Sequence, residues 1–96
     1  MLDLVAIKMI WNRNLDRKIE EAGWLLDTKD SNGIVYKKSI WARFYIKHKF
    51  VEILHNQIIV YTLCDGLDKE PARLTYKELK LFMKKFKQMK KEYGWK

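Results

Sequence analysis

The sequence predicts one α+β domain with a short N-terminal helix, a four-stranded antiparallel sheet and a long C-terminal helix. Helical periodicity occurs near both ends of the chain, and the segment between them carries strand patterns only. Strands that follow one another without a crossover helix pair antiparallel. The 96 residues, 48% of them hydrophobic, suffice for a single core. We therefore expect residues 1–96 to form one two-layer domain, with both helices on one face of the sheet.

The C-terminal helix is predicted from its two ends. Thr75 followed by Glu78 fits a capping box, in which each side chain satisfies a free amide of the first turn. Gly94 is the residue type that ends a helix in the left-handed conformation. Within the segment 75–94 we expect a helix from Tyr76 to Tyr93, roughly 27 Å long at about 1.5 Å per residue.

This helix carries an apolar stripe and a basic stripe. We expect the apolar stripe to dock on the sheet; it consists of Leu79, Phe82, Met83, Phe86 and Tyr93, with Met89 at its edge. The basic stripe, here called the lysine row, consists of Lys77, Lys80, Lys84, Lys87 and Lys91. Residues 75–96 hold eight lysines and two glutamates, so +6 of the formal net charge of +8 lies there. The row is either a solvated face or a contact for phosphates or for an acidic protein surface.

The N-terminal part of the chain predicts a short amphipathic helix. The apolar run at 1–11 is too short to reveal a period, so a strand and a helical turn are both open there. After a cap at Asn12 or Asn14 a helix begins, and Gly23 ends it. Its buried face consists of Leu15, Ile19 and Ala22.

The next segment predicts a hairpin. Residues 24–27 form its first strand, and Asn32-Gly33 is a strong turn signal before the strand that begins GIVYKK. The segment TKDSNG also resembles half of a calcium loop. However, Thr28 replaces the first acidic ligand and Ser39 occupies the place of the bidentate glutamate, so we favour a plain turn.

Residues 40–47 alternate in polarity, which predicts a further strand with two different faces. One face consists of Ile40, Ala42, Phe44 and Ile46, and the other of Trp41, Arg43, Tyr45 and Lys47. The alternation of apolar and polar residues falls out of step near His48, where we expect a bulge or a turn. The segment IIVYTLC at 58–64 predicts a last, buried strand, and 65–70 a surface connection to the C-terminal helix.

The face formed by Trp41, Arg43, Tyr45 and Lys47 is a second candidate site. Aromatic and basic side chains interleaved on an open sheet face bind single-stranded nucleic acid by stacking and charge. Exposed apolar patches also mark protein partners, and the alternative is that these aromatics merely cover an open face. Sixteen of the twenty basic residues are lysine. This argues against sequence-specific recognition, because arginine is the side chain that grips guanine edges in a bidentate way.

The sequence contains no recognisable catalytic or metal-binding pattern. His48, His55, Cys64 and Asp65 match no zinc spacing, and no motif supplies Cys64 with an activating base. We expect no metal, no cofactor and no enzymatic activity. A single cysteine excludes an internal disulfide and favours a reducing compartment. There is neither a signal-peptide pattern nor a run of about 18 apolar residues, so we expect a cytoplasmic protein without membrane contact.

Three short motifs give the chain a resemblance to a known group of proteins. They are EEAGW at 20–24, GIVYKK at 33–38 and a capped terminal helix that closes in Gly94-Trp95. With them the chain resembles small uncharacterised accessory proteins encoded by phages and mobile elements of Gram-positive bacteria. These motifs are caps and turns, so no functional residue carries over. The resemblance implies a host protein or ribonucleoprotein complex as the partner, and inhibition of a defence nuclease as one outcome.

Two functions follow as hypotheses. The first is a non-enzymatic binding protein that acts on a macromolecular partner in the host cytoplasm. One form of this hypothesis is an anti-CRISPR-like or other anti-defence inhibitor of a host nucleic-acid-handling complex. The alternative is direct binding of RNA or single-stranded DNA through the lysine row and the sheet aromatics.

Overall fold

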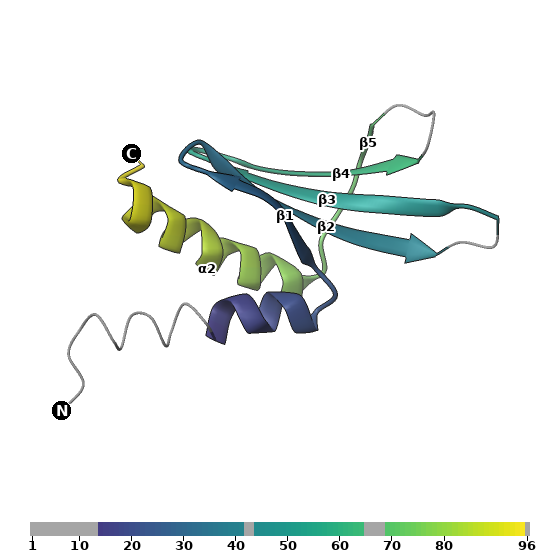
Figure 1. Ribbon diagram of the computed structural model, residues 1–96, viewed down its shortest axis with the longest axis horizontal. Coiled ribbons are helices and arrows are strands. Elements are labelled where there is room, and N and C mark those ends of the chain that lie inside the picture. Colours follow the sequence, from purple (N-terminus) through teal and green to yellow (C-terminus); the bar gives the residue numbers. More distant parts are fainter. Residues whose placement is uncertain (1–13, 42–43, 65–68, 96) are drawn as a thin grey trace.

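The computed structural model describes residues 14–41, 44–64 and 69–95 (Figure 1). Within these residues the predicted α+β class is confirmed, with two helices and an antiparallel sheet. The sheet has five strands, not four, because a two-residue strand precedes the last helix. The elements are a first helix over 14–21, β1 Leu25–Asp30, β2 Gly33–Trp41, β3 Ile46–Leu54, β4 Ile58–Cys64, β5 Glu70–Pro71 and α2 Tyr76–Tyr93. Several predictions fall outside the described residues, namely those for 1–11, Asn12, Ala42, Arg43 and 65–68.

The strands form a meander in the order β1-β2-β3-β4-β5, and every neighbouring pair is antiparallel. The predicted hairpin is confirmed, but its two turn residues are Ser31 and Asn32, and Gly33 already begins β2. The Asp30 carboxylate holds this turn by accepting hydrogen bonds from the backbone N–H groups of Asn32 and Gly33, at 2.8 and 3.1 Å. Gly33 is needed because a Cβ there would lie 2.7 Å from the backbone oxygen of Ile53. The first hairpin is thus specified by local turn chemistry and one close strand contact.

The predicted strand over 40–47 is wrong, because a hairpin turn divides it. β2 continues to Trp41, β3 begins at Ile46, and Ile40 pairs with Lys47 across the turn. The irregularity expected near His48 is also wrong, since His48 pairs in register with Ser39. The even-numbered residues of β2 and the odd-numbered residues of β3 face the core. The change of phase visible in the sequence therefore comes from the turn, which lies earlier than predicted.

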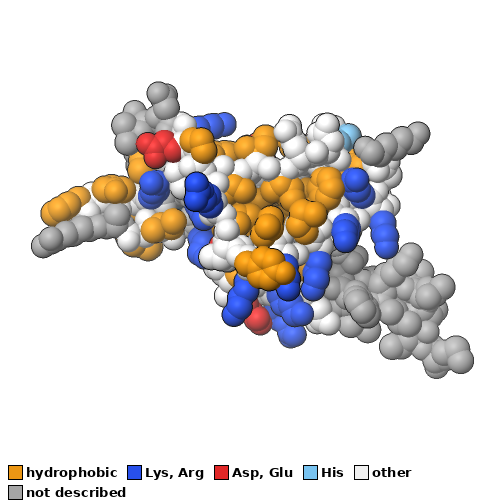
Figure 2. All heavy atoms as spheres, turned by 180° about the vertical axis from the view of Figure 1, so that it is seen from behind, with side chains coloured by type: hydrophobic (Ala, Val, Ile, Leu, Met, Phe, Trp, Pro, Cys, Tyr) orange, Lys and Arg blue, Asp and Glu red, His pale blue; other side chains and the backbone are white. Residues whose placement is uncertain are grey.

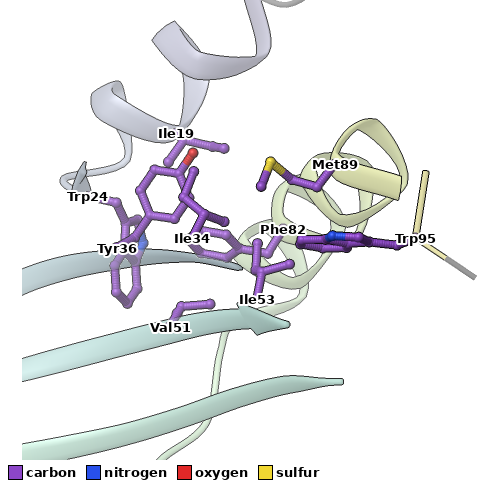
Figure 3. Packing of buried hydrophobic residues seen from close by; sticks show 9 residues of the cluster. All are labelled: Ile19, Trp24, Ile34, Tyr36, Val51, Ile53, Phe82, Met89 and Trp95. Atoms are coloured by element: carbon purple, nitrogen blue, oxygen red, sulfur yellow. The ribbon is translucent and has the colours of Figure 1, made fainter. Parts of the chain in front are cut away.

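The core joins one face of the sheet to both helices (Figure 3). Its sheet residues Ile34, Tyr36, Val51 and Ile53 share a face by strand pairing. The residues that pack there from the two helices are Ile19, Phe82 and Met89, and those from the segments directly after the helices are Trp24 and Trp95. The Trp24 and Phe82 rings meet edge to face, with centroids 5.2 Å apart. The predicted first-helix face is confirmed, since Ile19 is buried and Leu15 and Ala22 pack against the same cluster.

Both ends of α2 follow the predicted local rules. Thr75 and Glu78 form the capping box, and Gly94 ends α2 in the left-handed conformation with φ 65°. Gly23, with φ 96°, follows the first helix in the same way. Asn14 already lies inside that helix and is therefore not its cap.

The buried face of α2 differs from the predicted stripe. Phe82 and Met89 are buried as expected, but Leu79 and Met83 remain 44% and 42% exposed. Glu78 and Lys85 take their place in the interior. The helix is thus rotated about its axis relative to the orientation that hydrophobicity alone predicts.

Candidate interaction surfaces

Two buried polar contacts set the rotation of α2. The Glu78 carboxylate accepts hydrogen bonds from the Trp24 indole N–H at 2.7 Å and from the Lys38 ammonium at 3.3 Å. It also accepts one from the backbone N–H of Thr75, at 3.1 Å. Burial raises the pKa of Glu78, but the hydrogen bonds from Thr75 and Trp24 and the charge of Lys38 outweigh it and hold the pKa below its usual value.

The second contact joins the two helices directly. Lys85 is only 3% exposed, and its ammonium donates to the Asp16 carboxylate of the first helix at 2.7 Å. A buried lysine without an anionic partner is strongly disfavoured, so this pair fixes which side of α2 faces the first helix. Together, Glu78 and Lys85 turn the opposite side of α2 outward.

That outward side carries the lysine row. All five of its lysines are exposed, as the sequence predicts for one helical stripe. Within the described part of the chain, no carboxylate lies within ion-pair distance of these five ammonium groups. The Lys80 ammonium lies 4.5 Å from the centroid of the Tyr76 ring. The row is therefore an exposed basic edge without an ion pair to any described carboxylate.

An exposed apolar stripe runs beside the lysine row. Tyr76, Leu79 and Met83 are 70%, 44% and 42% exposed, and their spacing of three and four residues places them on one line along α2. At about 100° per residue this line adjoins Lys80 and Lys87. On the face shown in Figure 2, hydrophobic side chains lie near the centre of the view, with lysine and arginine side chains beside them. We call the stripe and the lysine row together the α2 surface.

The second candidate site is changed by the position of the hairpin turn. Trp41 pairs with Ile46 and Lys47 pairs with Ile40, so Trp41 and Lys47 face opposite sides of the sheet. Trp41 and Tyr45 do lie near the same end of the β2–β3 hairpin, and they are 79% and 57% exposed. Figure 1 shows this end projecting beyond both helices. Arg43 lies outside the described residues, so the predicted face is only partly assembled.

The structure adds a row that the sequence analysis missed, on the sheet face turned away from the helices. Lys37, Phe50 and Tyr61 lie side by side on β2, β3 and β4. The two rings stack with centroids 5.1 Å apart. Lys37 lies over Phe50, and Lys69 lies 4.7 Å from the Tyr61 centroid. The Phe50–Tyr61 stack and the contact of Lys37 with Phe50 both depend on which residues pair across the strands. The sequence analysis missed this register because it misplaced the turn between β2 and β3.

Acidic groups border this row on the side away from the hairpin end. The Tyr61 hydroxyl donates to the Glu52 carboxylate at 2.8 Å. Burial, the Glu52 hydrogen bond and the charges of Glu52 and Asp27 raise the pKa of Tyr61 to about 12. The outward sheet face is therefore acidic near Glu52 and basic toward Lys37.

The residues weighed for metal binding are separated in the described structure. His48 shares a hydrogen bond with the Ser39 hydroxyl at 3.0 Å, whereas His55 stacks on Trp95 beyond the other end of β3. Cys64 is half-buried at the end of β4, and Asp65 is not described. Among the described residues no three His, Cys, Asp or Glu side chains gather into a potential metal site. Nor does either described helix have the length and apolar character of a membrane span.

Comparison of the chain with protein-family models, with curated proteins and with solved structures finds no match. Function is therefore inferred from the surfaces themselves.

Proposed function

We propose that this chain is a non-enzymatic binding protein whose α2 surface docks on an acidic, partly apolar surface of another protein. The observation that carries the proposal is the exposed line of Tyr76, Leu79 and Met83 beside a lysine row that makes no ion pair with a described carboxylate. Protein interfaces combine an apolar centre with a polar, charged rim. A helix that presents apolar side chains at spacings of three and four is also a recurrent way of filling a groove.

The composition of the α2 surface favours a protein over a phosphate backbone. Phosphate contacts draw on charged and polar donors. Exposed Leu79 and Met83 of the α2 surface gain nothing from a phosphate. Burying those two side chains against a partner would stabilise the complex by the hydrophobic effect.

The resemblance to phage and mobile-element accessory proteins supplies the biological setting. The partner in this proposal belongs to a host protein or ribonucleoprotein complex in the cytoplasm. If α2 occupies a surface that a nucleic-acid-handling complex needs for its activity, binding would inhibit that complex. The protein would then act as an anti-CRISPR-like inhibitor. Because the lysine row is basic, electrostatic complementarity requires that the surface it occupies be acidic, unlike the basic surfaces that hold nucleic acid itself.

Site-specific crosslinking in host lysate tests the proposal. A photo-crosslinking amino acid replaces Met83 in one protein and exposed Lys18 of the first helix in a control. We expect a discrete protein adduct from position 83 but not from position 18, and we expect it to persist after nuclease treatment. Adducts that disappear with nuclease, or that form equally from position 18, would contradict the proposal.

A matched pair of variants then measures what the stripe contributes. Leu79→Ser with Met83→Ser removes two exposed apolar side chains, and Leu25→Ser removes one that is 64% exposed on β1. Once the partner is captured, the double variant should bind it at least about tenfold more weakly, while Leu25→Ser binds normally. Equal binding by all three proteins would remove the α2 surface from the interface.

A further inference from the structure

We propose that the hairpin end, together with the basic half of the outward sheet face, is a binding site for single-stranded nucleic acid. Its members are Trp41, Tyr45, Lys37, His48 and Lys69. This site is separate from the α2 surface and does not depend on the proposed protein partner. By strand register, Trp41, Lys37 and His48 lie on the face opposite to the core that holds α2. A strand bound there would not touch the lysine row.

Exposed rings provide the first argument. Trp41 is 79% exposed at the end of β2, which leaves its indole accessible for stacking. Tyr45, 57% exposed, lies directly before β3 at the same end of the hairpin. Bases stack on such aromatic side chains regardless of sequence, which is how single strands are commonly held. The sequence preference expected of this site is therefore small.

The second argument is the arrangement of Phe50 and Tyr61. Each ring has one face against the other ring, and lysines lie over them from the neighbouring positions. These faces are already occupied, so the pair does not serve as a stacking platform. It instead places the ammonium groups of Lys37 and Lys69 on either side of the stack, where each can meet a phosphate.

Charge provides the third argument and sets the boundary of the site. The described residues of the outer hairpin, 37–41 and 44–50, include four lysines and no acidic residue. Three of these lysines, Lys38, Lys47 and Lys49, lie on the core side of the sheet and have partners in Glu78, Glu70 and the Arg73 backbone oxygen. Lys37 faces outward, with its ammonium over the Phe50 ring, and makes no ion pair with a described carboxylate. The carboxylates of Glu52 and Asp27, whose charges help to raise the pKa of Tyr61, lie on the side of the row of Lys37, Phe50 and Tyr61 that is farther from the hairpin end. A polyanion would thus lie between Trp41 and Lys37 and avoid the acidic side.

A single strand matches this surface better than a protein or a lipid headgroup does. Each nucleotide offers a flat ring and an anion, which correspond to the two kinds of group exposed here. An acidic peptide offers the anion without a regular supply of rings. Duplex DNA keeps its bases stacked inside, so it cannot use Trp41.

Fluorescence anisotropy with labelled dT12 and rU12 tests the inference. We expect Trp41→Ser to weaken binding by roughly 5- to 150-fold, the range for loss of one stacked base. The matched control is Tyr76→Ser, which removes an aromatic residue of similar exposure on α2 and should leave binding unchanged. Lys37→Gln should reduce the slope of log K against log salt by roughly 0.7, the value for one phosphate contact on a single strand.

Several results would overturn this site. They are no measurable binding of either oligonucleotide at 50 mM salt, equal losses for Trp41→Ser and Tyr76→Ser, or binding of a 12-base-pair duplex as tight as that of dT12. Trp41-dependent binding to vesicles rich in phosphatidylserine, without oligonucleotide binding, would assign the hairpin end to a lipid surface instead. Crosslinking from position 83 is unaffected by all of these outcomes, so the two proposals fail separately.

Discussion

The α2 surface and the hairpin end both expose large apolar side chains beside lysines, but they are supported differently. Phe82 and Met89, directly behind the α2 surface, are completely buried. Along the core-facing side of β2 the exposed fraction rises from 1% at Ile34 and 5% at Tyr36 to 41% at Ile40. Segments with few buried apolar contacts open at a lower free-energy cost than segments in the core.

This difference suits the two proposed ligands. A surface fixed by a packed helix presents one shape, which favours a folded partner with a complementary groove. Trp41 and Tyr45 lie beyond the core and are largely exposed, which favours a chain-like ligand whose bases stack on their rings in varied positions. Support from the core, rather than exposure alone, therefore distinguishes the two surfaces.

The largest expected effect comes from removing the support of α2. Phe82→Ala should lower the free energy of unfolding by about 3–5 kcal/mol, because a fully buried aromatic ring is replaced by a cavity. Urea unfolding measures the loss, with Leu79→Ala as a control that should cost under about 1 kcal/mol. A loss near the control value for Phe82→Ala would mean that α2 does not dock through this face.

The helix–helix contact should have a smaller effect. Asp16→Ala leaves the buried Lys85 ammonium unpaired, and we expect a loss of about 1–3 kcal/mol because Asp16 itself is half exposed. Lys85→Met fills the same space with an uncharged side chain and should cost less than Asp16→Ala. If Lys85→Met proves the more damaging substitution, the pair itself, rather than the unpaired lysine, is what stabilises the fold.

Acid should weaken the other contact of α2. Because the folded-state pKa of Glu78 is lowered, its ionised form stabilises the fold above the unfolded-state value of about 4.5, and this contribution disappears as the pH falls through the folded-state pKa. The stability advantage of the native protein over Glu78→Gln should therefore shrink between pH 5 and pH 3. Urea unfolding at pH 7, 5 and 3 measures it, and a constant difference would contradict the assignment.

The smallest effect on stability is expected from the lysine row. Lys80→Gln, Lys84→Gln and Lys87→Gln together should leave stability unchanged or raise it by a few tenths of a kcal/mol, because like-charge repulsion along the helix is removed. Association with an acidic protein partner should slow, most clearly at low salt. Binding of dT12 should stay the same. A strong loss of dT12 binding would mean that the two surfaces act as one.

Local sequence rules were sufficient for both ends of α2, for the end of the first helix and for the first hairpin turn. The capping box of Thr75 and Glu78, the glycine stops at Gly23 and Gly94, and the turn before Gly33 were all predicted correctly. Each involves groups within about five positions along the chain, whose geometry is fixed by backbone hydrogen bonding. The lysine row was predictable for the same reason, because helix spacing alone aligns it.

Only the tertiary structure decided which side of α2 is buried and where the middle hairpin turns. Hydrophobicity placed Leu79 and Met83 inside, but Glu78 finds the Trp24 indole 54 positions away and Lys85 finds Asp16 69 positions away. Polarity alone cannot reveal that a charged side chain has a buried partner so distant in sequence. The turn was misplaced because alternation looks the same along one strand as across a hairpin. Pairing of Tyr36 with Val51, set by packing in the core, distinguishes the two.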